Sequence, residues 1–422
     1  MKTWNAAEGI DIRMLHADAF KTNLCSLYLY YPLKRETVTK AALLSRVLSR
    51  GTKDYPTLTD ISKKMEEMYG AVFTTSVKKK GSGEAVVFSL EFVADRYAGQ
   101  DVTTEALQFL IQAACEPVCE NGVFRSDYVA QEKENLRNTI EGLINDKRQY
   151  AQYKCVENMF RDDAYGIFEY GYTDDLAEIN ETNLYEFYQE LLKTAKIDLF
   201  FSGTWEEEPM RQKLTSLLNQ AFSPRQADYL PPVPAQKRGE AQKIVEDAEV
   251  AQSKLALGFT CDAAPTGQSF CEFLTMTCVF GGSPFSKLFN NVREKMSLAY
   301  YVSAAAERSK GVMFVNSGIE TDKFQAAFDE ILNQLRMVQN GEISDAELDA
   351  AKKYLTNNIR SMHDSLRTME ENCYTLCTLG SQENLDDMLP QISAVSKPDI
   401  SRVAKTVKLD TVYFLKGKEG QA

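Results

Sequence analysis

Residues able to bind a metal ion are scarce in this chain of 422 residues. It has only two histidines, His16 and His363, which lie in opposite halves of the sequence. A zinc-binding helix of the HExxH or HxxEH type needs two histidines four residues apart. The sequence therefore contains no such helix, and we interpret both histidines as ordinary surface or core residues.

The cysteines are the other candidate ligands. There are nine of them, with no CxxC pair. Cys115 and Cys119, like Cys373 and Cys377, are spaced four apart, but no second pair or neighbouring histidine completes either site. Buried, apolar cysteine is therefore the favoured interpretation. The odd number predicts free thiols in a reducing compartment.

One segment of the second half carries a specific pattern. It runs from Ser286 to Val302, reads SKLFNNVREKMSLAYYV, and follows the pair Gly281-Gly282. The glycine pair and the SKLF, REK and LAY groups come in an order and spacing that resemble the C-terminal-domain signature of M16 (insulinase/pitrilysin-like) zinc peptidases. The resemblance extends over nearly the whole chain.

The resemblance implies roles for Arg293 and Tyr300. In M16 peptidases an arginine and a tyrosine seven positions apart act from the C-terminal domain on the zinc site of the N-terminal domain. Arginine offers several fixed donors and tyrosine one hydroxyl donor. Such a pair can hold a peptide carbonyl and stabilise the oxyanion of hydrolysis. On spacing alone, Arg293 would be a surface helix residue and Tyr300 a core residue of a strand.

The N-terminal domain of an active member carries HxxEH, followed after a few residues by Gly-Thr. The Gly51-Thr52 dipeptide fixes the alignment in this chain. Ala42 and Arg46 then stand at the two histidine positions, and Ser45 stands at the glutamate. Alanine cannot ligate a metal ion, and serine is a poor base. Arg46 puts a permanent positive charge at a ligand position, and like charges about 4 Å apart repel by roughly 1–4 kcal/mol. We therefore expect no metal in this chain.

A distal glutamate completes the zinc site of active members. It lies in a helix that reads roughly EKxxxxxxxE, with an aspartate five residues further on. Glu132-Lys133, Glu141 and Asp146 keep this register. Glu141 therefore matches a ligand position, but alone it binds no metal, and a solvated helix glutamate is the favoured interpretation.

The elements that must position these residues repeat in two halves. A proline-rich stretch, Phe222–Gly239, lies between them. It predicts an N-terminal domain of residues 1–221, a linker of residues 222–246 and a C-terminal domain of residues 247–422.

Each half alternates short apolar runs with amphipathic segments. Strands are expected at Leu24–Tyr31, Ala71–Lys78, Glu84–Val93, Asp198–Ser202, Ala251–Thr260, Ala299–Glu307, Val312–Glu320 and Thr411–Leu415. Helices are expected at Thr39–Ser49, Leu58–Tyr69, Thr103–Cys115, Ser126–Arg161, Thr182–Thr194, Gln268–Val279, Phe285–Lys295, Asp322–Val338, Asp345–Ser361 and Leu366–Leu379.

This order predicts an α+β fold of two tandem duplicated domains. Each would be a twisted, largely antiparallel sheet packed by helices, and the resemblance implies the LuxS/MPP-like metallohydrolase fold. Two unrelated α+β domains are the alternative on pattern alone.

Charge and hydropathy restrict the partners. The net charge of −12 disfavours nucleic acid and anionic lipid. No run of eighteen apolar residues exists and no apolar signal region follows the start, so we expect a cytoplasmic protein without a membrane span.

Some bacterial and mitochondrial M16 members divide the active site between two chains, one with HxxEH and one with the arginine and tyrosine. This sequence resembles the second kind, most closely the paired short bacterial proteins linked to modification of elongation factor P. The resemblance implies a heterodimer with an HxxEH partner that holds the zinc.

The expected substrate is an extended peptide, added as a strand to a sheet edge near Phe73–Val77. The alternative is a catalytically inactive scaffold or peptide-binding protein of the same fold. A homodimeric enzyme of unrelated chemistry is disfavoured, because no Ser-His-Asp set, phosphate loop or Rossmann fingerprint is found.

Overall fold

The computed structural model describes residues 1–417, which form two compact units. Unit 1 contains residues 1–141, 167–230 and 365–378, and unit 2 contains residues 142–166, 231–364 and 379–417. Each unit is thus assembled from both halves of the chain. Unit 1 takes one helix from the second half, and unit 2 takes one helix from the first half.

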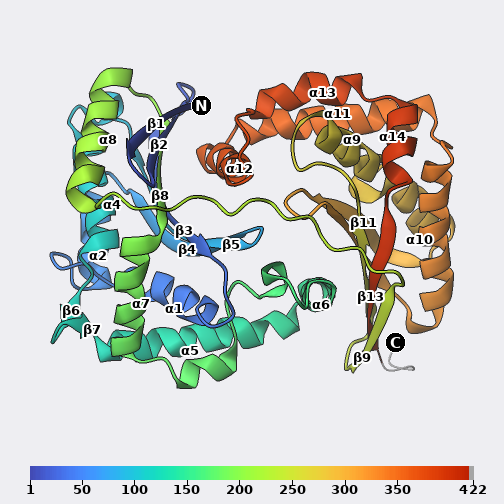
Figure 1. Ribbon diagram of the computed structural model, residues 1–422, viewed down its shortest axis with the longest axis horizontal. Coiled ribbons are helices and arrows are strands. Elements are labelled where there is room, and N and C mark those ends of the chain that lie inside the picture. Colours follow the sequence, from blue (N-terminus) through green and yellow to red (C-terminus); the bar gives the residue numbers. More distant parts are fainter. Residues whose placement is uncertain (418–422) are drawn as a thin grey trace. The chain divides into compact units, whose positions relative to one another are not determined.

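Unit 1 is built on a six-stranded sheet with the order β1-β2-β8-β3-β5-β4 (Figure 1). Its strands are β1 (Lys2–Ala7), β2 (Ile10–His16), β3 (Thr22–Pro32), β4 (Val72–Lys80), β5 (Gly83–Val93) and β8 (Lys196–Gly203). The β2/β8 pair is parallel, and the other pairs are antiparallel. A separate short hairpin joins β6 (Cys119–Glu120) and β7 (Val123–Phe124).

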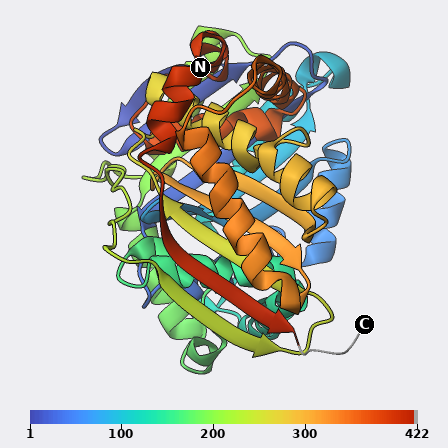
Figure 2. The same cartoon turned by 90° about the vertical axis from the view of Figure 1, so that its right-hand side faces the viewer.

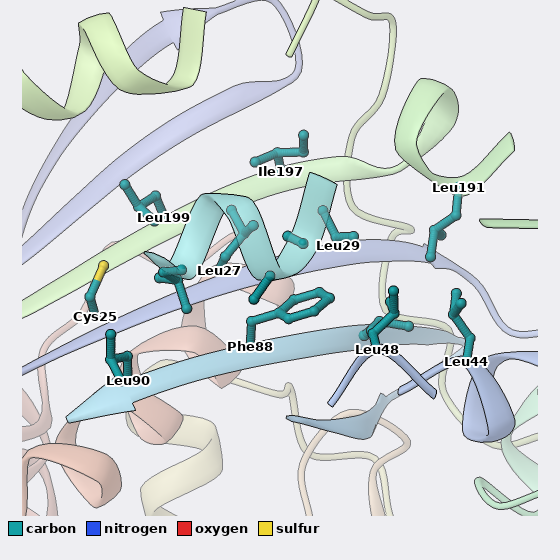
Figure 3. Close-up of a cluster of buried hydrophobic side chains, with 14 of the residues drawn as sticks. Cys25, Leu27, Leu29, Leu44, Leu48, Phe88, Leu90, Leu191, Ile197 and Leu199 are labelled. Carbon is teal, nitrogen blue, oxygen red and sulfur yellow. The ribbon is translucent and has the colours of Figure 1, made fainter. Parts of the chain in front are cut away.

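One face of this sheet holds the main core of unit 1. The helices that unit 1 takes from the first half of the chain are α1 (Val38–Leu48), α2 (Leu58–Glu67), α3 (Asp95–Ala98), α4 (Val102–Cys115), α5 (Ser126–Gly142), α7 (Glu181–Thr194) and α8 (Glu207–Ala221). Figure 3 shows Leu44 of α1 and Leu191 of α7 beside Leu29 and Phe88 of the sheet. Alternate residues of β3 and β5 supply this face, as the two-residue period of a strand requires.

The other face of the unit 1 sheet is covered by α12 (Leu366–Thr378). Tyr374 stacks on Tyr28 of β3, with ring centroids 3.9 Å apart. Glu370 is buried beside them and accepts hydrogen bonds from the hydroxyls of Tyr28 (3.0 Å) and Ser202 (3.1 Å). Burial disfavours its charged form and raises the pKa of this carboxyl to about 7.

Unit 2 is built on a five-stranded sheet with the order β11-β12-β10-β13-β9. Its strands are β9 (Gln242–Ala248), β10 (Ser253–Thr260), β11 (Ala299–Glu307), β12 (Val312–Ile319) and β13 (Lys408–Gly417). This order repeats β4-β5-β3-β8-β2 of unit 1, and β13 and β9 form the parallel pair (Figure 2). The predicted fold class, two duplicated α+β units, is confirmed.

The helices of unit 2 also cover both faces of its sheet. One face packs against α9 (Gly267–Thr277), α10 (Phe324–Gln339), α11 (Asp345–Met362), α13 (Met388–Ala394) and α14 (Lys397–Ala404). The other face packs against α6 (Lys147–Met159), the helix from the first half of the chain. Tyr150 of α6 and Tyr413 of β13 both donate hydrogen bonds to Glu246 of β9, at 2.9 and 2.5 Å. None of the helices in residues 1–417 is long and apolar enough to cross a membrane.

The structure corrects the predicted elements at several places. All eight expected strands are present, but β1, β2, β6, β7 and β9 were not predicted, and β9 begins at Gln242, inside the range expected as a linker. The expected helix Ser126–Arg161 is two helices, because α5 ends at Gly142 and Asp146 begins a new one. Asp146 accepts hydrogen bonds from the backbone N–H groups of Arg148 and Gln149, both at 3.1 Å, and so caps α6.

Candidate functional site

The positions aligned with a zinc motif lie on α1, which is almost entirely buried. Ala42 is 1% exposed and Ser45 is 4% exposed, and the Ser45 hydroxyl donates back to the carbonyl of Ala42 at 2.9 Å. Both positions therefore belong to the core of unit 1 rather than to a metal site. The apolar residues of α1 pack on the sheet, and this packing fixes the helix.

Arg46 is the one member of this set that reaches the surface, where it is half-buried. It lies in the last turn of α1, where a cation interacts favourably with the helix dipole. One of its guanidinium nitrogens donates to Thr139 Oγ1 of α5 at 2.9 Å. One turn further on, Arg50 contacts Glu132 of α5 at 3.0 Å. The two arginines hold α1 beside α5.

Glu141 lies in the last turn of α5, two residues after Thr139, and is exposed. Its carboxylate makes no hydrogen bond or ion pair within residues 1–417. The structure therefore brings Glu141 and Arg46 onto neighbouring helices, as the predicted register requires, but gives Glu141 no role in packing.

The residues at these positions do not fit a zinc ion. Zinc takes cysteine, histidine and carboxylate ligands, whereas α1 offers a methyl group, a buried hydroxyl and a guanidinium. Across the described part of the chain, no group of three or more histidine, cysteine, aspartate or glutamate side chains could hold a metal.

Arg293 lies on a seven-residue π-helix, η5 (Phe289–Lys295). Single π turns are rare and occur often at functional sites. The Arg293 guanidinium lies over the Phe289 ring, 4.8 Å from its centroid, and 3.6 Å from the carboxylate of Glu294. Its side chain is 42% exposed, so most of its donors are available to another molecule.

Tyr300 lies in a β-bulge at the beginning of β11, the edge strand of the unit 2 sheet. Ala299 pairs with Ile319 and Tyr301 pairs with Gly318, so Tyr300 is the extra residue. A bulge re-aims a side chain and often lies beside an active site. Tyr300 is 59% exposed, which corrects the alternative interpretation of it as a core residue of a strand.

Gly318 makes the bulge sterically feasible. A Cβ atom at this position would lie 2.5 Å from the Tyr301 ring, closer than carbon atoms approach. The ring of Tyr301 therefore occupies the space of the missing side chain, while the neighbouring Tyr300 faces outward. Gly318 was not predicted as part of the site, although a glycine inside a predicted strand is a signal of a bulge or a close approach.

A carboxylate holds the Tyr300 hydroxyl. Tyr300 donates to Glu320 Oε1 at 3.2 Å, and Lys323 pairs with the same carboxylate at 2.9 Å. These two contacts, Lys323 first, lower the pKa of Glu320. Lys323 also donates to the carbonyl of Ser297 at 3.4 Å, in the turn between Arg293 and Tyr300. Glu320 and Lys323 had no sequence signal of their own.

The predicted peptide-binding edge, Phe73–Val77, lies within β4, which is the last strand of the unit 1 sheet. Thr75 in the middle of β4 donates to the carbonyl of Ser45 at 2.6 Å. The C-terminal half of α1 therefore adjoins the middle of the edge strand. The sequence prediction that this segment forms a sheet edge is confirmed, and its binding of peptide remains a prediction.

All nine cysteines are free thiols. Burial raises the pKa of Cys115, Cys271 and Cys377 to about 12, so these thiols are unreactive near neutral pH.

Each histidine has an aspartate neighbour. His16 Nε2 lies 3.0 Å from a carboxylate oxygen of Asp18, and His363 Nε2 lies 3.1 Å from one of Asp386.

Comparison with known proteins shows what the chain is similar to. The family description "Peptidase M16 inactive domain" matches residues 178–355. A protein of Bacillus subtilis (strain 168), named probable inactive metalloprotease YmfF, is 30% identical over 98% of this chain and 97% of its own length. An uncharacterized zinc protease of Rickettsia bellii is 19% identical over 69% of the chain and 70% of its own length.

Solved structures share the fold. A conserved protein from Enterococcus faecalis V583 superposes with a TM-score of 0.92 at 28% identity, covering 100% of this chain and 99% of that chain. A peptidase M16 inactive domain from Pseudomonas fluorescens superposes with a TM-score of 0.82 at 16% identity, with the same coverage.

Proposed function

The chain belongs to the M16 peptidase family, and we propose that it is the non-zinc subunit of a heterodimeric metallopeptidase. It would be inactive alone and would contribute Arg293 and Tyr300 to the zinc site of an HxxEH partner. The observation that carries this proposal is the bulge at Tyr300. An edge bulge that turns a tyrosine outward, seven residues after a half-exposed arginine, is unnecessary for packing, and neither side chain is buried.

In this proposal the two side chains act on a bound peptide. The guanidinium of Arg293 and the hydroxyl of Tyr300 would donate to the carbonyl oxygen of the bond to be cleaved. Such donors are worth most when negative charge develops on that oxygen. The Tyr300 hydroxyl has a single proton, which Glu320 accepts in the free chain, so the hydroxyl would turn from that carboxylate to the carbonyl oxygen when peptide binds. The chain would work in the cytoplasm, and a link to elongation factor P remains a prediction from resemblance.

The second candidate is a scaffold or peptide-binding protein without catalysis. The observation that favours it is α1, where Ala42 and Ser45 are core residues and no metal ligand remains. A scaffold has no need of exposed donors at Arg293 and Tyr300, and this is the point at which the two candidates differ.

The test is reconstitution of this chain with an HxxEH chain of similar length encoded beside it. Cleavage of a quenched fluorescent peptide would be measured for each chain alone and for the mixture. We expect cleavage only by the mixture, and a loss of about 10²–10³ in kcat/KM for Arg293→Ala. The isolated chain should contain no stoichiometric zinc.

The matched control is Arg360→Ala. Arg360 is an exposed arginine of α11, and its side chain makes no hydrogen bond or ion pair in the described chain. It should leave cleavage and assembly unchanged. If Arg293→Ala leaves the rate of an active mixture unchanged, or if one equivalent of zinc stays with the isolated chain, the subunit proposal is wrong. An assembled but inactive mixture would favour the scaffold.

A further inference from the structure

Arg46 is unlike Arg50, which follows the end of α1. Arg50 is paired with Glu132 and also donates to Gln131. Arg46 donates only to the neutral hydroxyl of Thr139, and no carboxylate of residues 1–417 lies within ion-pairing distance of it. A guanidinium has five N–H donors. With one hydrogen bond, to Thr139, Arg46 therefore has most of its N–H donors without a protein acceptor.

The surroundings of Arg46 place those donors beside an unpaired strand. The Thr75 hydroxyl of β4 binds the carbonyl of Ser45, the residue next to Arg46, at 2.6 Å. β4 pairs with β5 on one side only. A strand added to its other side would lie about 4.8 Å away, and its side chains would pass the end of α1.

Other groups around this position do not neutralise Arg46. Tyr170 lies close enough for the positive charge of Arg46 to oppose the rise in its pKa, which burial and Glu169 cause. Lys79, on the same edge strand, donates to the carbonyl of Ile167 at 3.0 Å. Glu169 acts on Tyr170 but makes no ion pair with Arg46, so the guanidinium of Arg46 has no carboxylate partner in residues 1–417.

We propose that Arg46 binds an acidic side chain of an extended peptide that adds to β4, so that this position selects peptides by their carboxylate. A carboxylate is the group that a guanidinium fork binds with two parallel hydrogen bonds. Thr75 is the fourth of nine residues in β4, so an added strand continues past Arg46 in both directions. The carboxylate is therefore that of an aspartate or glutamate side chain, rather than of a chain end. The inference rests on the part of the proposed function in which the chain holds an extended peptide.

The test measures peptide binding by the isolated full-length chain. Fluorescence anisotropy would compare three fluorescein-labelled nonapeptides of alternating alanine and threonine. The first has a central glutamate and an amidated end, the second has a central glutamine and an amidated end, and the third has a central glutamine and a free carboxylate end. We expect the glutamate peptide to bind about tenfold more tightly than the glutamine peptide. The acidic net charge of the protein would produce the opposite preference.

Two variants assign that preference to Arg46. Arg46→Gln should abolish the difference between the glutamate and glutamine peptides, and Arg46→Lys should keep part of it as a point charge. The control is Arg211→Gln, a partly exposed arginine of α8 in the same unit that pairs with Glu208. It should keep the full preference. Circular dichroism melts would check that each variant is folded.

Four outcomes would overturn the inference. These are equal binding of the glutamate and glutamine peptides, a preference that persists in a folded Arg46→Gln, tightest binding of the free-carboxylate peptide, and no binding of any peptide up to millimolar concentration. The assay contains no partner and no cleavage. Its failure therefore leaves the test of Arg293 and Tyr300 untouched, and failure of that test leaves this one untouched.

Discussion

The edge strands β4 of unit 1 and β11 of unit 2 occupy equivalent places in the duplicated fold, yet only β4 pairs regularly along its whole length. β4 pairs with β5 without interruption from Val72 to Lys80, and its second pair is Phe73 with Leu90. β11 has an extra residue after its first pair, and its second pair is Tyr301 with Gly318. A leucine in unit 1 thus corresponds to a glycine in unit 2. The regular edge offers backbone to a strand, whereas the bulged edge presents a tyrosine.

The covered faces of the two sheets differ as well. In unit 1, α12 buries the Glu370 carboxyl between two hydroxyl donors. In unit 2, α6 meets the Glu246 carboxylate at the edge strand β9. Each unit takes a helix from the other half of the chain. In unit 1 that helix buries Glu370 in the interior, whereas in unit 2 it contacts Glu246 at the margin of the sheet. Four substitutions test these differences on one scale, the free energy of unfolding.

The largest effect is expected for Glu370→Gln, and it depends on pH. The pKa of Glu370 is raised from 4.5 to about 7 in the fold. The folded chain therefore holds this proton more tightly than the unfolded chain. The carboxyl lowers the free energy of unfolding as pH rises from about 4.5 to about 7, with little change above. Glutamine does not titrate. The free energy of unfolding of the variant, relative to that of the natural chain, should therefore rise by on the order of 2–3 kcal/mol from pH 5 to pH 8.

Urea unfolding at several pH values measures this gain. The groups that face Glu370 are Ser26, Tyr28, Ser202 and Arg367, and the substitution leaves all four in place. Glu370→Ala is the control, because it removes the same charge but also leaves a cavity. It should be destabilising at pH 5. Parallel pH curves for the natural chain and Glu370→Gln would contradict the prediction.

Gly318→Leu would place in β12 the residue type that Leu90 has at the equivalent position of β5. The new Cβ atom would collide with the Tyr301 ring, so we expect a loss of about 2 kcal/mol, typical of overpacking. Tyr301→Ala should be tolerated better in the Gly318→Ala background than alone, since it removes the ring that the new Cβ atom would strike, and that Cβ atom fills part of the space that the ring leaves. A double-mutant cycle measures this coupling. Additive losses would show that the ring does not hold the bulge.

Asp146→Ala tests the boundary between the helices that enter different units. Asp146 caps α6 through two backbone N–H groups, and loss of a cap costs about 1 kcal/mol. Asp101→Ala is the matched control in unit 1, where Asp101 caps α4 through Thr104 at 2.9 Å. The two losses, measured by urea unfolding, should be similar. A much larger loss for Asp146 would mean that the break after α5 has a role beyond capping.

The sequence predicted regular elements well because their signals are local. Alternation along Leu24–Tyr31 and Glu84–Val93 marks strands that one face of the sheet buries, and the structure has both. The bulge at Tyr300 depends on a one-residue shift against Gly318, eighteen positions later in the sequence. No residue of the strand β9 is fully buried. Its sequence therefore lacks the apolar run that marks a core strand, and most of it was predicted as part of the linker.

The exchange of α6 and α12 between units has no local signal either. Each helix is amphipathic in the ordinary way, and only contacts far apart in sequence decide which sheet it covers, such as Glu370 with Tyr28. For the candidate site, the residue types at Ala42, Ser45 and Arg46 could be read directly. The partners that define their surroundings, Thr75 and Thr139, come from β4 and α5 and required the structure.

The smallest effect on stability is expected for Tyr300→Phe, and this smallness distinguishes function from packing. Tyr300 is 59% exposed, and its one hydrogen bond is to an exposed carboxylate, so the free energy of unfolding should change by less than about 0.5 kcal/mol. In the reconstituted pair the same variant should lower kcat while KM changes little, because the hydroxyl donor matters most as charge develops. Glu320→Gln keeps the hydroxyl donor and changes only the acceptor from which it would turn to the substrate, so its loss of kcat should be smaller. A Tyr300→Phe variant that unfolds more easily but cleaves normally would assign the bulge to packing, and the two sheet edges would then differ in shape alone.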